Sequence, residues 1–328
     1  MMNDQTLTAE PVATGPGLWS RADITDDAWM VPLGPEAQAE IAAFLRAYRS
    51  APVPLFLLQP RDYDFAHCAA AVARARHILE QGVGFVLLDR IDLDSMTDDE
   101  GRAVYWMICN LLSRPVAQSQ RGSILHEVRD HGMKAEPGSK VRPNETNQDI
   151  AFHNDNAFNP LMPDYVGLLC LQAAREGGLS RVMHLNQVHS LLQAHHPEVL
   201  PRLFEPFWLF RNGQHDPDEP PVIAEPIFNH VNGRLCARFG IHMILGGYRH
   251  RGEPLDTRGV AALAAIENVF AMPDYQFEFA MHRGQIQFVQ NLQIGHSRSD
   301  FVDFDEPERK RCLVRSWLRA RGRPSYTG

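Results

Sequence analysis

The sequence lacks several features that mark whole classes of protein. No apolar run reaches the roughly 18 residues that a membrane-spanning helix needs. Its five cysteines are scattered and form no C-x-x-C, which argues against a disulfide scaffold or a zinc cluster. Lys and Arg number 32 against 40 Asp and Glu, so no basic surface for nucleic acid is expected. Because no secretory signal opens the chain either, we expect a cytoplasmic protein that binds neither membrane nor nucleic acid.

Nucleotide-binding glycine motifs are also missing, since neither G-x-G-x-x-G nor a P-loop occurs. Apolar residues make up 44% of the 328 residues and charged residues 22%, which is typical of a globular protein with a full core. The polar stretch 1–17 predicts a flexible arm. We expect the remainder, 18–328, to form a single domain.

The pattern of apolar residues predicts many short strands with hairpin turns, and helices clustered mainly in the first third of the chain. Helices are expected at 35–48, 65–81, 97–112, 186–194, 197–204 and 257–270. Strands are expected at 84–88, 122–128, 165–171, 181–184, 223–229, 235–239, 275–280, 285–290 and 311–318. Asn232-Gly233 is the strongest hairpin signal. The strands and helices do not alternate as a parallel sheet requires, so we predict a mainly β fold, an antiparallel barrel or jelly roll with flanking helices.

A histidine and an aspartate two residues apart, His153 and Asp155, stand between apolar residues. In a strand such residues point to the same side, so both could bind one metal ion while Asn154 turns away. Two histidines and one carboxylate, with other positions open, is the ligand set of non-haem Fe(II) oxygenases. The pair alone is weak evidence, because the chain holds 15 histidines and 40 acidic residues.

Three further motifs follow the H-x-D in order. They are G-G-x-S at 177–180, N-x-x-x-x-H-x-R-x-x-F at 291–301 and R-x-L-x-R-x-W at 311–317. With these four motifs the chain resembles the TauD/TfdA family of Fe(II)/2-oxoglutarate-dependent dioxygenases. The closer similarity is to its clavaminate synthase-like bacterial members, and it extends over most of the chain.

The resemblance implies a double-stranded β-helix, or jelly roll, with a 2-His-1-carboxylate iron site. By motif, the metal ligands and catalytic centre are His153, Asp155 and His296. Arg311 matches the arginine that binds the C5 carboxylate of 2-oxoglutarate, and Ser180 the hydroxyl beside it. A guanidinium plane suits bidentate carboxylate binding. Strand parity does not separate Arg311 from Arg315, so Arg315 is a second candidate for the co-substrate.

The cofactors implied are Fe(II), 2-oxoglutarate and O₂, with succinate and CO₂ as co-products. The resemblance implies oxidation of an unactivated C–H bond of a small molecule, by hydroxylation or, alternatively, by desaturation or ring closure. The carboxylate at Asp155 favours oxygenation over halogenation. Among substrates, an amino acid or an amino-acid-derived natural-product intermediate is favoured over a sulfonate-like acid. The sequence leaves open whether the protein is a monomer or a homodimer.

Candidate substrate contacts flank the ligands and are Gln148, Asn156, Phe158 and Arg238. The Gly- and Pro-containing stretches 130–148 and 156–163 are predicted to cover the substrate. Close bacterial relatives often have a shorter segment after the H-x-D, so their substrates do not transfer to this chain.

Plainer interpretations compete with some of these assignments. The remaining histidines without a spaced partner, among them His184 and His242, are expected to be structural or exposed. Trp317 is interpreted as a core aromatic residue, and Asn291 either orients the metal strand or satisfies backbone groups at a turn. Two other functional classes compete with a 2-oxoglutarate-dependent dioxygenase. They are a metal-dependent cupin-type enzyme that does not use 2-oxoglutarate and an inactive binding protein on the same fold. The first would need neither Arg311 nor Ser180.

Overall fold

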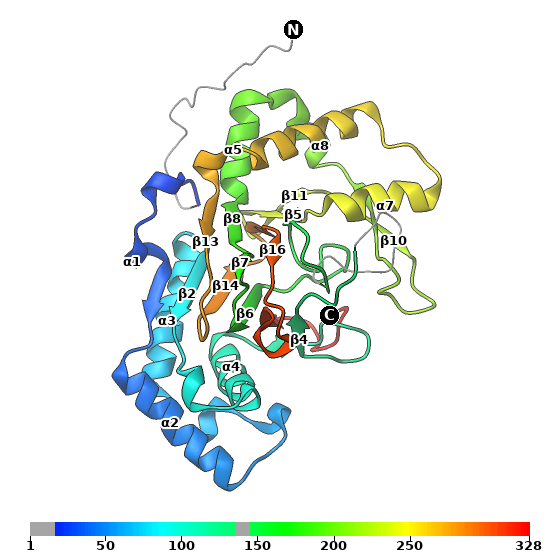
Figure 1. Ribbon diagram of the computed structural model, residues 1–328. Coiled ribbons are helices and arrows are strands. Elements are labelled where there is room, and N and C mark those ends of the chain that lie inside the picture. The colour runs from blue at the N-terminus through cyan, green and yellow to red at the C-terminus, as the bar shows by residue number, and fades with distance from the viewer. Residues whose placement is uncertain (1–16, 135–144) are drawn as a thin grey trace.

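The computed structural model describes residues 17–134 and 145–328, which fold into two facing β-sheets with helices on their outer sides (Figure 1). The predicted flexible arm therefore lies almost wholly outside the described residues. So does the middle of the predicted covering stretch 130–148.

The larger sheet has seven strands in the order β1-β2-β14-β6-β17-β3, with β4 also paired to β17. Every neighbouring pair is antiparallel except β1 and β2, which are parallel. The strands are β1 Met30–Pro32, β2 Phe85–Asp89, β3 Pro115–Val116, β4 Leu125–Val128, β6 Tyr165–Gln172, β14 Ile286–Gln290 and β17 Cys312–Leu318.

The smaller sheet has four antiparallel strands in the order β13-β8-β15-β5. Its strands are β5 Ile150–His153, β8 Ser180–His184, β13 Phe277–Phe279 and β15 Ile294–Arg298. Three two-stranded ribbons extend the fold: β7 Glu176–Gly177 with β16 Phe301–Val302, β9 Phe207–Phe210 with β10 Val222–Glu225, and β11 Phe228–Val231 with β12 Arg234–Ala237. Among the described strands the two sheets do not close into a barrel, so the fold is the jelly roll rather than the barrel.

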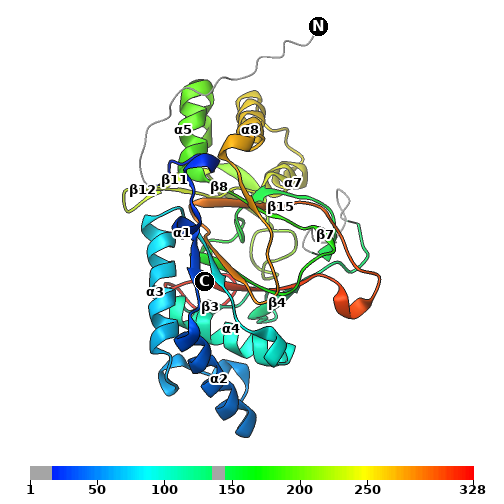
Figure 2. The same ribbon diagram turned by 60° about the vertical axis from the view of Figure 1, so that its left-hand side comes forward.

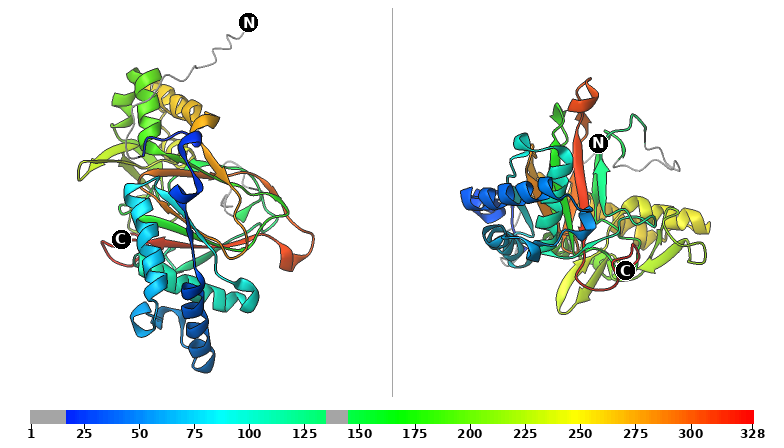
Figure 3. Two further views of the ribbon diagram at one scale, coloured as in Figure 1. Left: turned by 90° about the vertical axis from the view of Figure 1, so that its left-hand side faces the viewer. Right: turned by 90° about the horizontal axis from the view of Figure 1, so that it is seen from below.

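Helices cover the outer face of each sheet, as Figures 2 and 3 show from two sides. The alternation of side chains along β2 shows why the larger sheet is covered on its outer face. Val86 and Leu88 pack against the helices, while Phe85 and Leu87 face the space between the sheets. The larger sheet is covered by α2 Pro35–Ser50, α3 Ala66–Gln81 and α4 Asp98–Leu112. The smaller sheet is covered by α5 Leu185–His195 and α8 Thr257–Phe270, and the remaining helices are α1 Asp26–Trp29, α6 Leu200–Leu203 and α7 Ile241–Arg251.

The predicted class, mainly β with flanking helices, is confirmed, but individual elements differ. The strand expected at 223–229 is two strands, β10 and β11, because Pro226 lies between them and cannot donate to a ladder. The Asn232-Gly233 turn does join β11 to β12, with both residues at positive φ. Helix α7 was not predicted. A Cβ on Gly247 would clash with the carbonyl oxygen of Trp208. Glycine usually weakens a helix, but here the missing side chain lets α7 lie close to β9.

None of the helices within 17–134 and 145–328 is both long and apolar enough to cross a membrane. All five cysteines lie in this part of the chain and are free, and four of them are buried.

His184, at the junction of β8 and α5, makes the stability of the folded protein depend on pH. It is buried, and its Nδ1 accepts a hydrogen bond from the Asn186 N–H at 3.1 Å, which caps α5. Burial lowers the pKa of this imidazole from 6.5 to about 3. Below pH 6.5 the unfolded chain takes up a proton that the folded protein does not, so His184 lowers stability by about 1.4 kcal/mol per pH unit down to about pH 3.

We therefore expect His184→Gln, which keeps a cap acceptor without the titration, to flatten the fall in unfolding free energy between pH 6 and 4. Urea unfolding of both proteins across this range measures the difference. Because all other groups are shared, parallel curves for the two proteins would contradict the assignment.

Candidate metal centre

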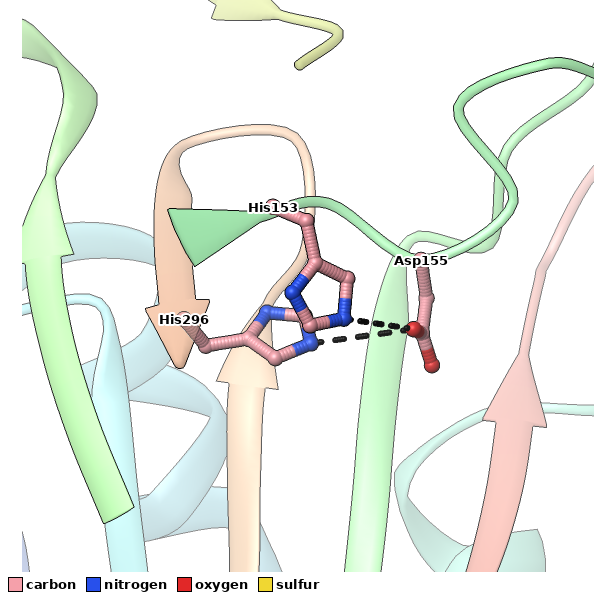
Figure 4. A group of neighbouring side chains, drawn as sticks. All are labelled: His153, Asp155 and His296. Atoms are coloured by element: carbon pink, nitrogen blue, oxygen red, sulfur yellow. Dashed lines mark ion pairs between the residues drawn. The ribbon is translucent and has the colours of Figure 1, made fainter. Parts of the chain in front are cut away.

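The two histidines of the site come from neighbouring strands of the smaller sheet. His153 ends β5 and pairs directly with His296 on β15, and their ring centroids are 4.4 Å apart. Asp155 follows two residues after His153 and turns its carboxylate toward both rings (Figure 4). The three residues form a candidate metal-binding group, with their ligand atoms all within 4.8 Å of one another.

The H-x-D does not lie on a strand, which corrects the sequence interpretation. β5 ends at His153, and Asp155 already belongs to the turn that follows. Asn154 does face away from the ligands, as predicted, and its side chain explains the change of direction. Its Oδ1 accepts from the Phe239 N–H at 2.9 Å, and its Nδ2 donates to the carbonyl of Ile294 at 3.0 Å.

A second asparagine holds the backbone of Asp155 itself. The Asn291 Oδ1 accepts from the Asp155 N–H at 2.9 Å, and its Nδ2 donates to the carbonyls of Asp155 and Pro163 at 3.0 and 3.1 Å. Asn291 is completely buried. The sequence offered two roles for Asn291, to orient the metal segment or to satisfy backbone groups. Its side chain does both.

We expect Asn291→Ala to lower the free energy of unfolding by about 3 kcal/mol, because three buried backbone groups lose their partner. Metal affinity should fall about tenfold, the smaller effect usual for residues that orient a ligand. Urea unfolding of the apoprotein and metal titration measure the two effects. The exposed Asn229→Ala is the matched control, expected within about 0.5 kcal/mol of the parent. An equal loss of unfolding free energy in Asn291→Ala and Asn229→Ala would refute the role of Asn291.

The ligand atoms of the three residues are spaced to bind one ion rather than to form hydrogen bonds with one another. Oδ1 of Asp155 lies 3.4 Å from Nε2 of His153 and 3.7 Å from Nε2 of His296, longer than good hydrogen bonds. Two ligand atoms bound about 2.1 Å from one ion at right angles would be about 3 Å apart. Nδ1 of His153 is 2.9 Å from the Ala151 carbonyl, which fixes the tautomer that leaves Nε2 free for a metal.

The outer oxygen of Asp155 is fully engaged by the larger sheet. Oδ2 accepts from Nε1 of Trp317 at 2.7 Å and lies 3.1 Å from Nη1 of Arg315. Burial alone would raise the pKa of Asp155, but the Arg315 charge and the two histidines hold that pKa well below its ordinary value. Burial, with the neighbouring His153, lowers the pKa of His296. The site thus presents an ionised carboxylate and a neutral imidazole, the forms that bind metals.

Two of these contacts were not predicted from the sequence. Trp317 is buried as predicted, but it is not merely a core aromatic residue, because its indole N–H reaches the metal carboxylate. Arg315 pairs with Asp155 and donates from Nε to Oε1 of Gln118 at 2.8 Å. Neither contact had a signal in the sequence, since both depend on how β17 packs against the turn after β5.

Arg311 lies just before β17 and is buried, and its Nη1 has no hydrogen-bond partner among the described residues. It lines a cavity of about 240 Å³ together with Cys170, Gly178 and Leu313. Gly178 has φ +67°, and a Cβ there would lie 3.1 Å from Nε of Arg311, so the second glycine of G-G-x-S leaves room for the guanidinium. The three candidate metal ligands do not line this cavity.

Ser180 begins β8 opposite Arg298 of β15. Its hydroxyl donates to Oε1 of Gln287 at 2.8 Å, a buried contact between the two sheets. Nη1 of Arg298 is a second buried guanidinium nitrogen with no partner in the described part of the chain. Arg298 and Arg311 lie 4.7 and 5.0 Å from the Phe301 ring centroid, so two cations gather near this end of the sheets.

The predicted substrate residues differ in their surroundings. Asn156 (φ +59°) accepts from Asn159, and Arg238 donates from Nη1 to the carbonyls of Ala157 and Asn159 at 2.7 and 2.6 Å. Phe158 is buried in the core between the sheets, and Gln148 is exposed. The segment 156–163 is thus a packed wall beside the ligands. Contact of these four residues with a substrate stays a prediction.

Two facing sheets that hold two histidines and one carboxylate define the class of non-haem metal oxygenases. The family model described as "Taurine catabolism dioxygenase TauD, TfdA family" matches residues 49–317, most of the chain. The chain belongs to this family of dioxygenases. The membership predicted from the four sequence motifs is therefore confirmed, and the chain is an enzyme of the dioxygenase class.

Curated relatives are similar along nearly the whole chain. FR-33289 synthase of Streptomyces rubellomurinus is 25% identical over 316 residues, covering 95% of this chain and 91% of the relative. The taurine hydroxylase-like protein SAT17 of Stachybotrys chartarum is 24% identical over 301 residues, covering 88% and 75%.

Solved structures share the fold at low sequence identity. An asparagine oxygenase in complex with Fe(II), 3-hydroxyasparagine and succinate superposes with a TM-score of 0.64 at 19% identity, covering 89% of this chain and 94% of that one. The non-haem iron oxygenase OrfP in complex with Fe and alpha-ketoglutaric acid gives 0.63 at 16% identity with the same coverage. Fe(II) and 2-oxoglutarate are the cofactors predicted for this chain. The OrfP complex contains Fe and 2-oxoglutarate, the asparagine oxygenase complex contains Fe(II) and succinate, and His153, Asp155 and His296 of this chain form a group that could hold the metal.

Proposed function

We propose that this protein hydroxylates an amino acid or an amino-acid-derived small molecule, using Fe(II), 2-oxoglutarate and O₂. The observation that carries the proposal is the convergence of Nε2 of His153, Nε2 of His296 and Oδ1 of Asp155 at the end of the smaller sheet. In the overall reaction a C–H bond becomes C–OH, and 2-oxoglutarate becomes succinate and CO₂.

The residues present fit iron. Two imidazoles and one carboxylate suit Fe(II), and three protein ligands leave positions for a co-substrate and for O₂. When bound, iron supplies the activation of O₂ that no side chain of the site can provide. The chain's own contribution is to orient the donors: Ala151 fixes the tautomer of His153, and Asn291 holds the backbone of Asp155.

Arg311 is proposed to bind the C5 carboxylate of 2-oxoglutarate. Its support is the unpartnered Nη1 beside a cavity, because a buried guanidinium without an acid partner is costly unless an anion completes it. Ser180 is proposed to add a hydroxyl contact once its hydrogen bond to Gln287 is exchanged. Arg315 is less available for this role, since it is already engaged by Asp155 and Gln118.

The proposal of an amino-acid substrate rests on similarity to enzymes whose complexes contain 3-hydroxyasparagine and (3S)-hydroxy-L-Arg. We further propose that residues 18–328 act as one domain and that the enzyme works in the cytoplasm, where its five free cysteines would stay reduced.

The proposal is tested by incubating the iron-loaded enzyme with 2-oxoglutarate and O₂ against a panel of free and N-acylated amino acids. Succinate and the mass of each candidate are followed. A substrate should stimulate succinate release and gain the mass of one oxygen atom. A product that loses two hydrogens would favour the alternative, desaturation or ring closure. Turnover that is independent of 2-oxoglutarate would refute the proposal in favour of a cupin-type enzyme.

A further inference from the structure

Trp317 stands where the larger sheet meets the metal carboxylate. Its Nε1 donates to Oδ2 of Asp155 at 2.7 Å, and Nη1 of Arg315 lies 3.1 Å from the same oxygen. The other oxygen, Oδ1, faces the two histidines. The two oxygens of one carboxylate thus have different partners: Oδ1 is directed to the candidate metal position, and Oδ2 is held by the indole N–H and by the ion pair with Arg315.

This division restricts how Asp155 can bind a metal. A carboxylate can bind through one oxygen or through both. To bind through both, Asp155 would have to rotate Oδ2 away from a buried indole N–H, which would then lose this hydrogen bond. The lost hydrogen bond is a charged one, which is the stronger kind. The contact therefore favours binding through Oδ1 alone.

The indole ring is itself fixed from behind. Tyr326 stacks on it, with ring centroids 6.0 Å apart and planes at 15°, and the Tyr326 hydroxyl donates to Oε1 of Gln214 at 2.8 Å. The Arg315 guanidinium carbon lies 5.0 Å from the Trp317 ring centroid. Trp317 and Tyr326 are both buried, so the N–H cannot swing away to solvent.

We infer that Trp317 is a positioning residue that keeps Asp155 a one-oxygen ligand and so leaves a coordination position free beside 2-oxoglutarate. The inference rests on the proposed function, because it presumes iron at His153, Asp155 and His296. If the indole N–H is removed, only the ion pair with Arg315 still holds Oδ2, and this second oxygen can turn toward that position more readily.

The test uses Trp317→Phe, which removes the N–H and keeps a ring against Tyr326. Nitric oxide serves as the probe of the free position, because it binds there without turnover and gives an electron paramagnetic resonance signal. The anaerobic Fe(II) enzyme with saturating 2-oxoglutarate is titrated with it. We expect at least a tenfold weaker affinity for nitric oxide in Trp317→Phe. Affinity equal to that of the parent protein would overturn the inference.

Two matched controls separate positioning from packing. Trp106 is another buried tryptophan whose Nε1 donates, at 3.0 Å, to the carbonyl of Leu58 far from the ligands. Trp106→Phe should lower thermal stability without changing the affinity for nitric oxide, and Tyr326→Phe, which keeps the stacked ring, should stay within about twofold. Equal losses in Trp106→Phe and Trp317→Phe would show a packing effect and overturn the inference.

A second measurement does not depend on the variant folding. The indole N–H resonances of the ¹⁵N-labelled parent protein are followed while Zn²⁺ is added. One of the five should move strongly, because its acceptor becomes a metal ligand, and none moving would overturn the inference. A parent protein that binds nitric oxide poorly even with iron and 2-oxoglutarate would instead contradict the proposed function, on which the inference depends.

Discussion

Arg311→Met should weaken 2-oxoglutarate binding about a hundredfold or more while leaving metal binding nearly intact. The expected cost of about 3 kcal/mol follows because the C5 carboxylate would lose its only proposed buried cation and remain desolvated. Arg311 makes no contact with Asp155, so the ligand group should be undisturbed. Calorimetric titration of 2-oxoglutarate into the Zn²⁺-loaded protein measures the affinity without turnover.

Arg315→Met is the matched control, because it removes a second arginine from the same face of the same stretch. Its guanidinium pairs with Asp155 and Gln118, so its loss should lower metal affinity more than 2-oxoglutarate affinity. The reverse pattern, with 2-oxoglutarate binding lost in Arg315→Met and retained in Arg311→Met, would show that the co-substrate role had been given to the wrong arginine.

His296→Ala should reduce Fe(II) affinity by at least about a hundredfold, since even residues that only orient a ligand usually change affinity 10–100-fold. The protein should remain folded, because Asp155 keeps Trp317 and Arg315 as partners and only one ring is lost from β15. Anaerobic equilibrium dialysis against Fe(II) gives the affinity.

His77→Ala serves as the control. His77 lies exposed on α3, on the outer side of the larger sheet, so its removal should leave Fe(II) binding unchanged. If His296→Ala retained the affinity of the parent protein, the ion would have to be bound elsewhere.

The sequence predicted that His153, Asp155 and His296 would come together, because the order and spacing of their motifs can be recognised along the chain. It predicted their local structure less well. A period of two residues places His153 and Asp155 on one side of a strand, but a turn can also bring them together. The turn is set by Asn154 and Asn291, whose partners are backbone groups of distant segments.

The contacts around Asp155 could not be predicted for a related reason. Trp317 alternates correctly as an inward residue of a strand, so packing in the core is the natural interpretation. Whether its N–H meets water, a carbonyl or a carboxylate depends on the register of β17 with β6 and on where the turn after β5 ends. Strand parity predicts one face for Arg311 and Arg315, and only the structure shows that Arg315 pairs with Asp155 while Nη1 of Arg311 has no partner among the described residues.

The central claim is that His153, Asp155 and His296 hold one iron to which 2-oxoglutarate binds. Adding 2-oxoglutarate to the anaerobic Fe(II) protein tests it most directly, through the visible metal-to-ligand charge-transfer absorption of a chelated 2-oxo acid. We predict one equivalent of this absorption per chain in the parent protein and none in His296→Ala. An undiminished absorption in His296→Ala, or none in the iron-loaded parent protein, would contradict the claim.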